Sequence, residues 1–179
     1  SVTGGEFIMT GGLIQNSETA SGNGGAVSVS GGGSASMRGS SVIKSSHAEN
    51  GYGGAVSISD GSFTMSGGTI GADDSECKAQ YGGAVSVTGG TFLMNSTSKI
   101  IGGNATVNGG AVYVNITVSS EEDSFTMSEG ASIENCTVFS GNGGAVSVSG
   151  GSASMIGNSV IMNSHAENGY GGAVSISNG

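Results

Sequence analysis

The most regular feature of the chain is an alternation of apolar and polar residues that returns after about 28 positions. Each return begins with the tetrapeptide Gly-Gly-Ala-Val, which starts at Gly24, Gly53, Gly82, Gly109, Gly143 and Gly171. A methionine keeps the same spacing, at Met9, Met37, Met65, Met94, Met127 and Met155. Both landmarks have one longer interval, in the fifth unit, so the two patterns indicate six copies of a single structural unit.

Each unit predicts three short strands, because alternation with a period of two between glycine-rich corners is typical of β-structure. The first strand follows Gly-Gly-Ala-Val and turns its valines inward, as at Val27 and Val29. The second strand is represented by residues 62–66, Ser-Phe-Thr-Met-Ser, and its inward aromatic position reads Phe7, Ala35, Phe63, Phe92, Phe125 and Ala153. The third, shorter strand carries Ile14, Ile43, Ile70, Ile101, Ile133 and Ile161.

Three strands and three corners in about 28 residues describe one coil of a parallel β-helix. We therefore predict an all-β fold, a right-handed single-stranded parallel β-helix (β-solenoid) of about six coils with three short strands per coil. Residues 1–179 then form a single β-helical segment. One coil buries too little apolar surface to stand alone, so stacked neighbours must supply both pairing and packing.

Two coils carry alanine at the aromatic position, Ala35 and Ala153. Their third strands read Ser-Val-Ile, so the β-branched side chains beginning at Val42 and Val160 are expected to fill part of the gap. Sequence drift between repeats explains the same difference, and both interpretations stay open.

A larger repeat spans four of these units. Residues 21–61 are nearly copied at residues 140–179, with an offset of 119 that falls to 118 after the loss of one glycine. Neither end carries a recognisable capping unit, although solenoids need terminal units that close their open edges. We expect the chain to be a segment of a longer repeat array, or a unit that stacks end to end on copies of itself.

Composition and charge narrow the functional classes. Glycine supplies 37 of 179 residues, and four Lys and Arg residues stand against 13 Asp and Glu residues. A net charge of −9 leaves no basic surface for nucleic acid, so we expect no nucleic-acid partner. No apolar run approaches the ~20 residues that span a bilayer, and we expect no membrane insertion by this segment.

The units resemble the glycine-rich repeats of bacterial cell-surface proteins, in which Gly-Gly-Ala-Val strands alternate with Gly-Thr-Phe-Thr-Met-Ser-Gly-Gly-Thr-Ile strands. Residues 61–70 and 89–94 match that pattern best. The chain is also similar to the repeats of polymorphic outer-membrane proteins and autotransporter adhesin passengers, although their Phe-x-x-Asn motif precedes Gly-Gly-Ala-Val only at residues 139–142. The resemblance implies a right-handed parallel β-helix on a cell surface that acts as an adhesin, a passenger or a stalk.

Carboxylates are the groups to test for catalysis, because β-helices also host polysaccharide lyases and hydrolases that use paired acids. Counted back from the following Gly-Gly-Ala-Val, Glu18 and Glu76 share a column but lie two coils apart. Arg38, the one arginine, is replaced by Ile156 in the second copy of the large repeat. We therefore predict that the chain is not an enzyme and has no catalytic or cofactor-binding residues.

Two acidic loops, residues 73–76 and 121–123, offer oxygen ligands of the kind that Ca²⁺ takes. Neither has the spacing of a calcium-binding loop, so we interpret both as solvated turns and predict no metal site and no cofactor. His47 and His165 occupy equivalent positions four coils apart, which is typical of loop histidines rather than of a metal site.

The two cysteines, Cys77 and Cys136, lie two coils apart, about 10 Å along the stack. This separation exceeds the usual reach of a disulfide, so we predict two free thiols, with pairing between chains as the alternative.

Two outward ladders complete the pattern. Serines alternate with the inward valines of the first strand, as at Ser57 and Ser86, and predict a flat array of outward hydroxyl groups that Tyr113 interrupts. The residue before Gly-Gly-Ala-Val is Asn23, Tyr52, Tyr81, Asn108, Asn142 or Tyr170. We expect the tyrosines of adjacent coils, Tyr52 and Tyr81, to stack as a structural ladder, with glycan binding as the alternative.

Together these features predict an extracellular β-helical rod that forms a cell-surface stalk or an end-to-end filament. The expected partner is a second copy of the chain. The alternative function is an adhesin-type module that binds host receptors or glycans.

Overall fold

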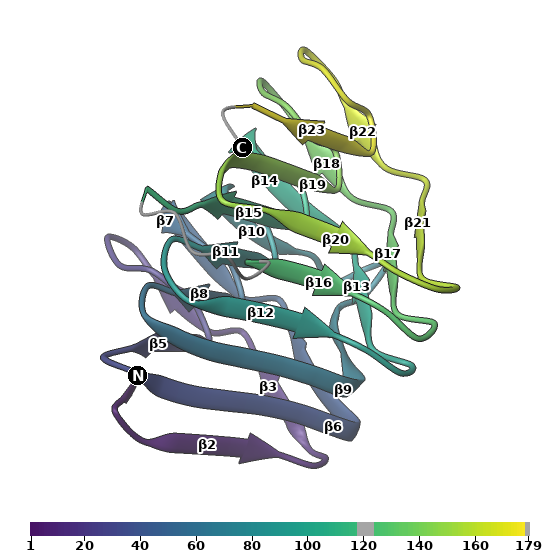
Figure 1. The fold of residues 1–179 in the computed structure, drawn as a ribbon. Helices are drawn as coiled ribbons and strands as arrows, with labels where there is room; N and C mark the ends of the chain where they lie inside the picture. The colour runs from purple at the N-terminus through teal and green to yellow at the C-terminus, as the bar shows by residue number, and fades with distance from the viewer. Residues whose placement is uncertain (118–123, 178–179) are drawn as a thin grey trace.

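The chain winds into a stack of parallel strands in which each coil lies on the one before it (Figure 1). The computed structural model describes residues 1–117 and 124–177. Within this part the strands form three sheets, whose paired strands all run parallel. No helix in the described ranges is long and apolar enough to cross a membrane. The structure confirms the predicted β-solenoid of about six coils.

Sheet A collects the strands that follow each Gly-Gly-Ala-Val sequence. Its described strands are β1 (Val2–Thr3), β5 (Val27–Ser30), β8 (Val56–Ile58), β11 (Val85–Val87), β15 (Val112–Asn115), β19 (Val146–Gly150) and β23 (Val174–Ile176). Equivalent residues pair from coil to coil, so that Val85 lies between Val56 and Val112. These three valines are fully buried, as the alternation predicts.

Sheet B contains the second and third predicted strands together. Its described strands are β2 (Glu6–Met9), β3 (Leu13–Gln15), β6 (Gly33–Lys44), β9 (Gly61–Gly71), β12 (Thr91–Met94), β13 (Lys99–Ile101), β16 (Phe125–Met127), β17 (Ser132–Glu134), β20 (Ala153–Met155) and β21 (Val160–Met162). In β6 and β9 the two predicted strands join into one continuous strand.

Sheet C is built from strands that the hydrophobic pattern does not predict. They are β4 (Glu18–Thr19), β7 (His47–Tyr52), β10 (Cys77–Tyr81), β14 (Gly103–Asn108), β18 (Thr137–Val138) and β22 (His165–Ala166). The inward residues of its middle strands include Ala48, Ala79 and Ala105, which are buried but small. Alanine gives a weak hydrophobic signal, so the alternation is hard to read from the sequence.

The core is a set of columns that run along the stack. In the aromatic column Phe92 pairs with Phe63 below and Phe125 above, and the ring centroids are 5.3 and 5.2 Å apart. The predicted register of this column is confirmed at all six coils, with Ala35 between Phe7 and Phe63 and with Ala153 above Phe125. Stacked rings at this separation combine apolar burial with a favourable offset geometry.

The two glycines of each Gly-Gly-Ala-Val sequence have different roles. The first has a positive φ, 63° at Gly82, which a residue with a side chain rarely adopts. The second lies flat against the backbone of sheet C. A Cβ atom at Gly83 would collide with the backbone nitrogen of Asn104 and the carbonyl oxygen of Gly110. The second glycine brings sheet A this close to the neighbouring backbone at five of the six tetrapeptides, from Gly25 to Gly144.

The inward isoleucine of the fourth coil is Ile100, and the prediction of Ile101 is wrong. Ile100 pairs with Ile70 and Ile133 and is fully buried, whereas Ile101 is partly exposed. Neighbouring residues of a strand face opposite sides, so the two isoleucines compete for one inward position.

The alanine coils are not filled in the way that the sequence predicts. Val42 is half-buried and alternates along β6 with the fully buried Ser41 and Ile43, and Val160 is 39% exposed. Both valines therefore lie on the outer face of sheet B. The expectation that they fill the space beside Ala35 and Ala153 is wrong.

Candidate functional site

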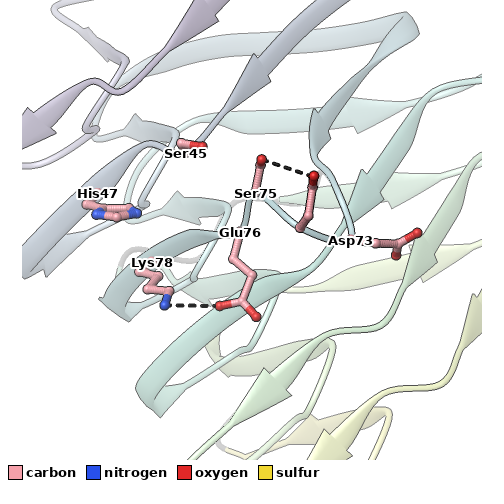
Figure 2. Close-up of a pocket in the computed structure, with 7 residues that line it drawn as sticks. Ser45, His47, Asp73, Ser75, Glu76 and Lys78 are labelled. Carbon is pink, nitrogen blue, oxygen red and sulfur yellow. Dashed lines mark hydrogen bonds and ion pairs between the residues drawn. The ribbon is translucent and has the colours of Figure 1, made fainter.

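A hollow on the side of the rod lies where the chain crosses from β9 to β10. In the coil below, only Ser45 and Ser46 connect β6 to β7, whereas residues 72–76 connect β9 to β10. The longer connection turns back through a hydrogen bond from the Ser75 nitrogen to the Ala72 carbonyl, at 3.1 Å. The hollow has a volume of about 410 Å³ and is lined by Ser45, His47, Asp73, Asp74, Ser75, Glu76 and Lys78 (Figure 2).

The carboxylates of this crossing are directed toward different partners. Asp73 accepts a hydrogen bond of 2.7 Å from the side-chain amide of Asn135 and lies apart from Glu76 in Figure 2. Glu76 forms an ion pair of 3.2 Å with Lys78 and accepts a hydrogen bond of 3.4 Å from the Asn104 amide. Both charged partners of the ion pair are partly exposed, so water screens their attraction.

These acids do not assemble a set of metal ligands. Asp74 accepts a hydrogen bond of 3.1 Å from the Ser75 hydroxyl group, away from the Glu76–Lys78 pair. Across residues 1–117 and 124–177, no group of three or more His, Cys, Asp or Glu side chains could hold a metal ion. The second acidic loop of the sequence, residues 121–123, lies outside the described residues.

Glu18 and Glu76 do not share a column, and this prediction is wrong. Glu18 pairs with His47, and His47 pairs with Lys78 on the next coil. The register shifts between Ala79 and Tyr81, so counting back from Gly-Gly-Ala-Val assigns Glu76 to the position that pairs with His47. Lys78 occupies that position instead.

The two histidines are not loop residues, and the prediction that they are is wrong. His47 lies in β7 and His165 lies in β22, in equivalent positions of sheet C.

Both cysteines are free, as predicted, and the structure shows in addition that both are fully buried. Gly103 separates them in the stack, because it pairs with Cys77 and precedes Asn104, which pairs with Thr137 next to Cys136. Burial raises the pKa of the Cys77 thiol to about 11 and that of the Cys136 thiol to about 12. Both groups are therefore neutral thiols at physiological pH, and a neutral thiol is a poor nucleophile.

We expect native protein to react with a thiol reagent at pH 8 at least about 100-fold more slowly than a free cysteine, because burial suppresses both thiolate formation and access. Ellman's reagent, followed with and without denaturant, measures this difference. Rapid reaction of two thiols in the folded protein would contradict the buried positions of Cys77 and Cys136.

The predicted outward serine ladder is covered in the middle of the rod. Ser57 and Ser86 are 3% and 0% exposed. The rings of Tyr52 and Tyr81 stack as predicted, with centroids 4.8 Å apart, and both lie against Tyr113, which pairs with Ser86 on the outer face of sheet A. The expectation of a flat, open hydroxyl array on this face is therefore wrong.

The residues that precede Gly-Gly-Ala-Val also connect successive coils through hydrogen bonds to asparagine side chains. The Asn23 side chain accepts a hydrogen bond from the Tyr52 nitrogen, and the Asn142 side chain accepts one from the Tyr170 nitrogen. The corner asparagines Asn23, Asn108 and Asn142 thus fasten their coils to the next. The Tyr170 ring, on the last described coil, is 82% exposed.

The two ends of the stack expose apolar residues that are buried inside it. At the last coil, Met155 is 51% exposed, although Met37, its counterpart in the first copy of the large repeat, is fully buried. At the first coil, Val2, Phe7 and Ile14 line a hollow at the lower end of the core. Phe125, Ala153 and Ile161 line a corresponding hollow at the upper end.

No family model, curated protein or solved structure matches the chain.

Proposed function

We propose that the chain is an extracellular structural rod, which serves as a cell-surface stalk or as a segment of a filament. The observation that carries the proposal is the continuity of the core columns, in which Val56, Val85 and Val112 occupy one position on successive coils. When every coil makes the same contacts with its neighbours, the number of coils determines the length of the rod, whereas its cross-section stays constant.

The placement outside the cell rests on the resemblance of the repeats to those of bacterial surface proteins. The chemistry of the outer face supports it. On sheet B, Ser62, Thr64 and Ser66 point away from the core, and only 9% of all residues are charged. Hydroxyl groups at these positions of β9 remain hydrated, and a surface with few charged groups gives neighbouring molecules few charges to bind, which suits a spacer.

Insertion of one extra large repeat tests the rod. Because residues 21 and 140 begin equivalent copies, duplicating residues 21–139 adds four coils in register. We expect the maximum dimension in small-angle X-ray scattering to increase by about 19 Å, four coils at ~4.8 Å each. A glycine- and serine-rich insert of equal length is the control. An unchanged maximum dimension, or loss of folding, would contradict the modular rod.

Surface labelling tests the location. An antibody against the folded rod is applied to intact and to permeabilised cells of the organism that makes the protein. We expect equal labelling of both, because an extracellular rod is accessible without permeabilisation. Labelling confined to permeabilised cells would overturn the extracellular placement, and an antibody against a known internal protein serves as the control for cell integrity.

An adhesin is the second candidate function, and the hollow beside β10 favours it. Hydroxyl, imidazole, ammonium and carboxylate groups line one polar recess there, and such groups can bind sugar hydroxyls. Binding to a glycan array that is lost in Lys78→Ala and retained in Lys44→Ala, a lysine outside the recess, would support this function.

We also propose that the chain is not an enzyme. The carboxylates of Asp73 and Glu76 face different partners, which supports this proposal.

A further inference from the structure

Three tyrosine rings stack beside the outer face of sheet A, on coils that have described coils on both sides. Tyr52 ends β7 and Tyr81 ends β10, and the two residues pair directly in sheet C. A backbone hydrogen bond of 2.9 Å from the Gly53 nitrogen to the Tyr81 carbonyl joins the two coils at this corner. Tyr113, in β15, packs against both rings. Contacts between neighbouring coils therefore fix the positions of all three rings.

The rings of Tyr52 and Tyr81 are the most nearly parallel pair of the three. Their planes differ by 14°, and their centroids are 4.8 Å apart, which equals the usual distance between paired strands. Because the two residues are also backbone partners, each ring atom lies beside its equivalent in the other ring. The carbons next to the two hydroxyl groups are therefore held close together as long as the rod is folded.

The other side chains that lose electrons readily are sealed inside these coils. The chain contains no tryptophan. The sulfur-containing residues of these and the adjoining coils are fully buried, namely Met37, Met65, Met94, Cys77 and Cys136. Tyr52 and Tyr81 are partly exposed, so a small oxidant can reach them. Since susceptibility to oxidation follows exposure, the two phenols are the groups that an oxidant meets in this part of the rod.

Tyr113 is a less suitable partner for either ring. Its plane is inclined by 39° to Tyr81 and by 31° to Tyr52, and its side chain is only 5% exposed. A phenol releases its proton when it loses an electron. The burial that raises the pKa of the Tyr113 phenol also leaves little water beside it to accept that proton. Geometry and exposure thus both favour the Tyr52–Tyr81 pair.

We propose that Tyr52 and Tyr81 form an oxidative cross-linking site, at which a diffusible one-electron oxidant converts the stacked pair to dityrosine. Each phenol loses one electron and its hydroxyl proton, and a carbon–carbon bond forms between the ring positions next to the two oxygens. The hydrogens on those two carbons then move to the oxygens, which restores both phenols. The pair loses two hydrogens in total, and hydrogen peroxide accepts the two electrons and two protons to give two molecules of water.

The product joins two neighbouring coils covalently. Tyr52 and Tyr81 are one coil apart, so the new bond closes a loop of one coil and removes conformations from the unfolded chain. We therefore expect the cross-linked protein to unfold at a higher urea concentration than the untreated protein. Circular dichroism during a urea titration measures the two midpoints.

Photo-oxidation followed by trypsin tests the site. The full chain is illuminated with a ruthenium tris-bipyridine complex and persulfate, which supply the one-electron oxidant and the peroxide, and is then denatured and digested. Trypsin cleaves after Lys78, between the two tyrosines, and separates residues 45–78 from residues 79–99. We expect mass spectrometry to find these two peptides linked, with the loss of two hydrogens. At a chain concentration of about 10 µM, this product should exceed coupling between chains by more than about 100-fold, because groups held side by side have a millimolar or higher effective concentration.

Two phenylalanine variants provide matched controls. Tyr52→Phe keeps an aromatic ring in the stack but removes the hydroxyl group, so we expect the linked peptides to disappear. Tyr170 is the counterpart of Tyr52 in the second copy of the large repeat, and its backbone nitrogen is bound to Asn142 rather than to a tyrosine. Tyr170→Phe is expected to leave the linked peptides unchanged. A circular dichroism spectrum verifies that both variants fold, and coupling of N-acetyltyrosinamide in the same light verifies the oxidant.

Three results would overturn the cross-linking site. One is the absence of linked peptides from the folded chain under conditions in which N-acetyltyrosinamide couples. Another is linkage of residues 79–99 to residues 100–179 in place of residues 45–78, which would assign the reaction to a different tyrosine. The third is an equal yield from a chain oxidised in denaturant, since the stack would then have no part in the coupling. The inference goes beyond the proposed function, and the rod stands in each case because it depends on the length increase and the surface labelling.

Discussion

Gly83→Ala is expected to destabilise the folded rod by more than about 3 kcal/mol, the largest effect of a single methyl group that we predict. The added Cβ meets the Asn104 backbone of sheet C on one side and the Gly110 carbonyl of the next coil on the other. Neither contact is the end of a flexible side chain, so relief requires two sheets to separate. Urea denaturation of the variant and the parent protein measures the difference in the free energy of unfolding.

Gly5→Ala is the matched control. No atom lies within 4 Å of a Cβ built at Gly5, and its φ is not positive. We expect this variant to be as stable as the parent protein or to gain up to about 1 kcal/mol, because alanine restricts the unfolded chain. Equal stability of Gly83→Ala and Gly5→Ala would show that sheets A and C do not approach each other as closely as the structure indicates.

Phe92→Ala is expected to cost about 3–5 kcal/mol, the range for removing a buried aromatic side chain. Its ring is 1% exposed and stacks between Phe63 and Phe125, so truncation leaves a cavity in the middle of the column and removes two ring contacts. The backbone of β12 is held between β9 and β16 and has little freedom to close the space. Thermal unfolding followed by circular dichroism measures the loss.

Leu93→Ala provides the comparison for Phe92→Ala. Leu93 is the next residue of β12 and points to the outer face, where it is only half-buried. We expect a cost of less than about 1 kcal/mol, because most of the side chain remains in contact with water. Similar losses in the two variants would argue that the aromatic column contributes no more to stability than the outer face does.

The aromatic and valine columns could be predicted from the sequence because large apolar side chains mark the inner face at a constant spacing. Phe63 and Phe92 are correctly placed for this reason. Where the inner face carries small residues, the signal disappears, and sheet C with Ala79 and Ala105 is missed. Where two isoleucines are adjacent, at Ile100 and Ile101, a shift of one residue exchanges the two faces of the strand.

The residues that line the hollow between β9 and β10 could not be assigned from the sequence, because their positions depend on local changes in length that the Gly-Gly-Ala-Val spacing does not show. The connection before Cys77 is longer than in the coil below, and the strand that begins at Cys77 is shorter. The count from Gly-Gly-Ala-Val therefore assigns Glu76 to the position that Lys78 occupies.

The tyrosine rings that lie over the outer face of sheet A could not be predicted for a different reason. Tyr52 reaches across from the corner of its coil to the outer face of sheet A, and its direction cannot be read from a pattern of period two.

The direction of the backbone hydrogen bonds has a mechanical consequence. Strands lie across the rod and pair with the coils above and below, so a pull along the axis loads the bonds of one coil at a time and peels the rod open, instead of shearing a whole sheet at once. A coil of about 28 residues adds ~4.8 Å to the folded rod and at most ~100 Å once extended. Under tension, a tether made of such coils would gain at most about 95 Å of length for each released coil and would therefore yield in steps.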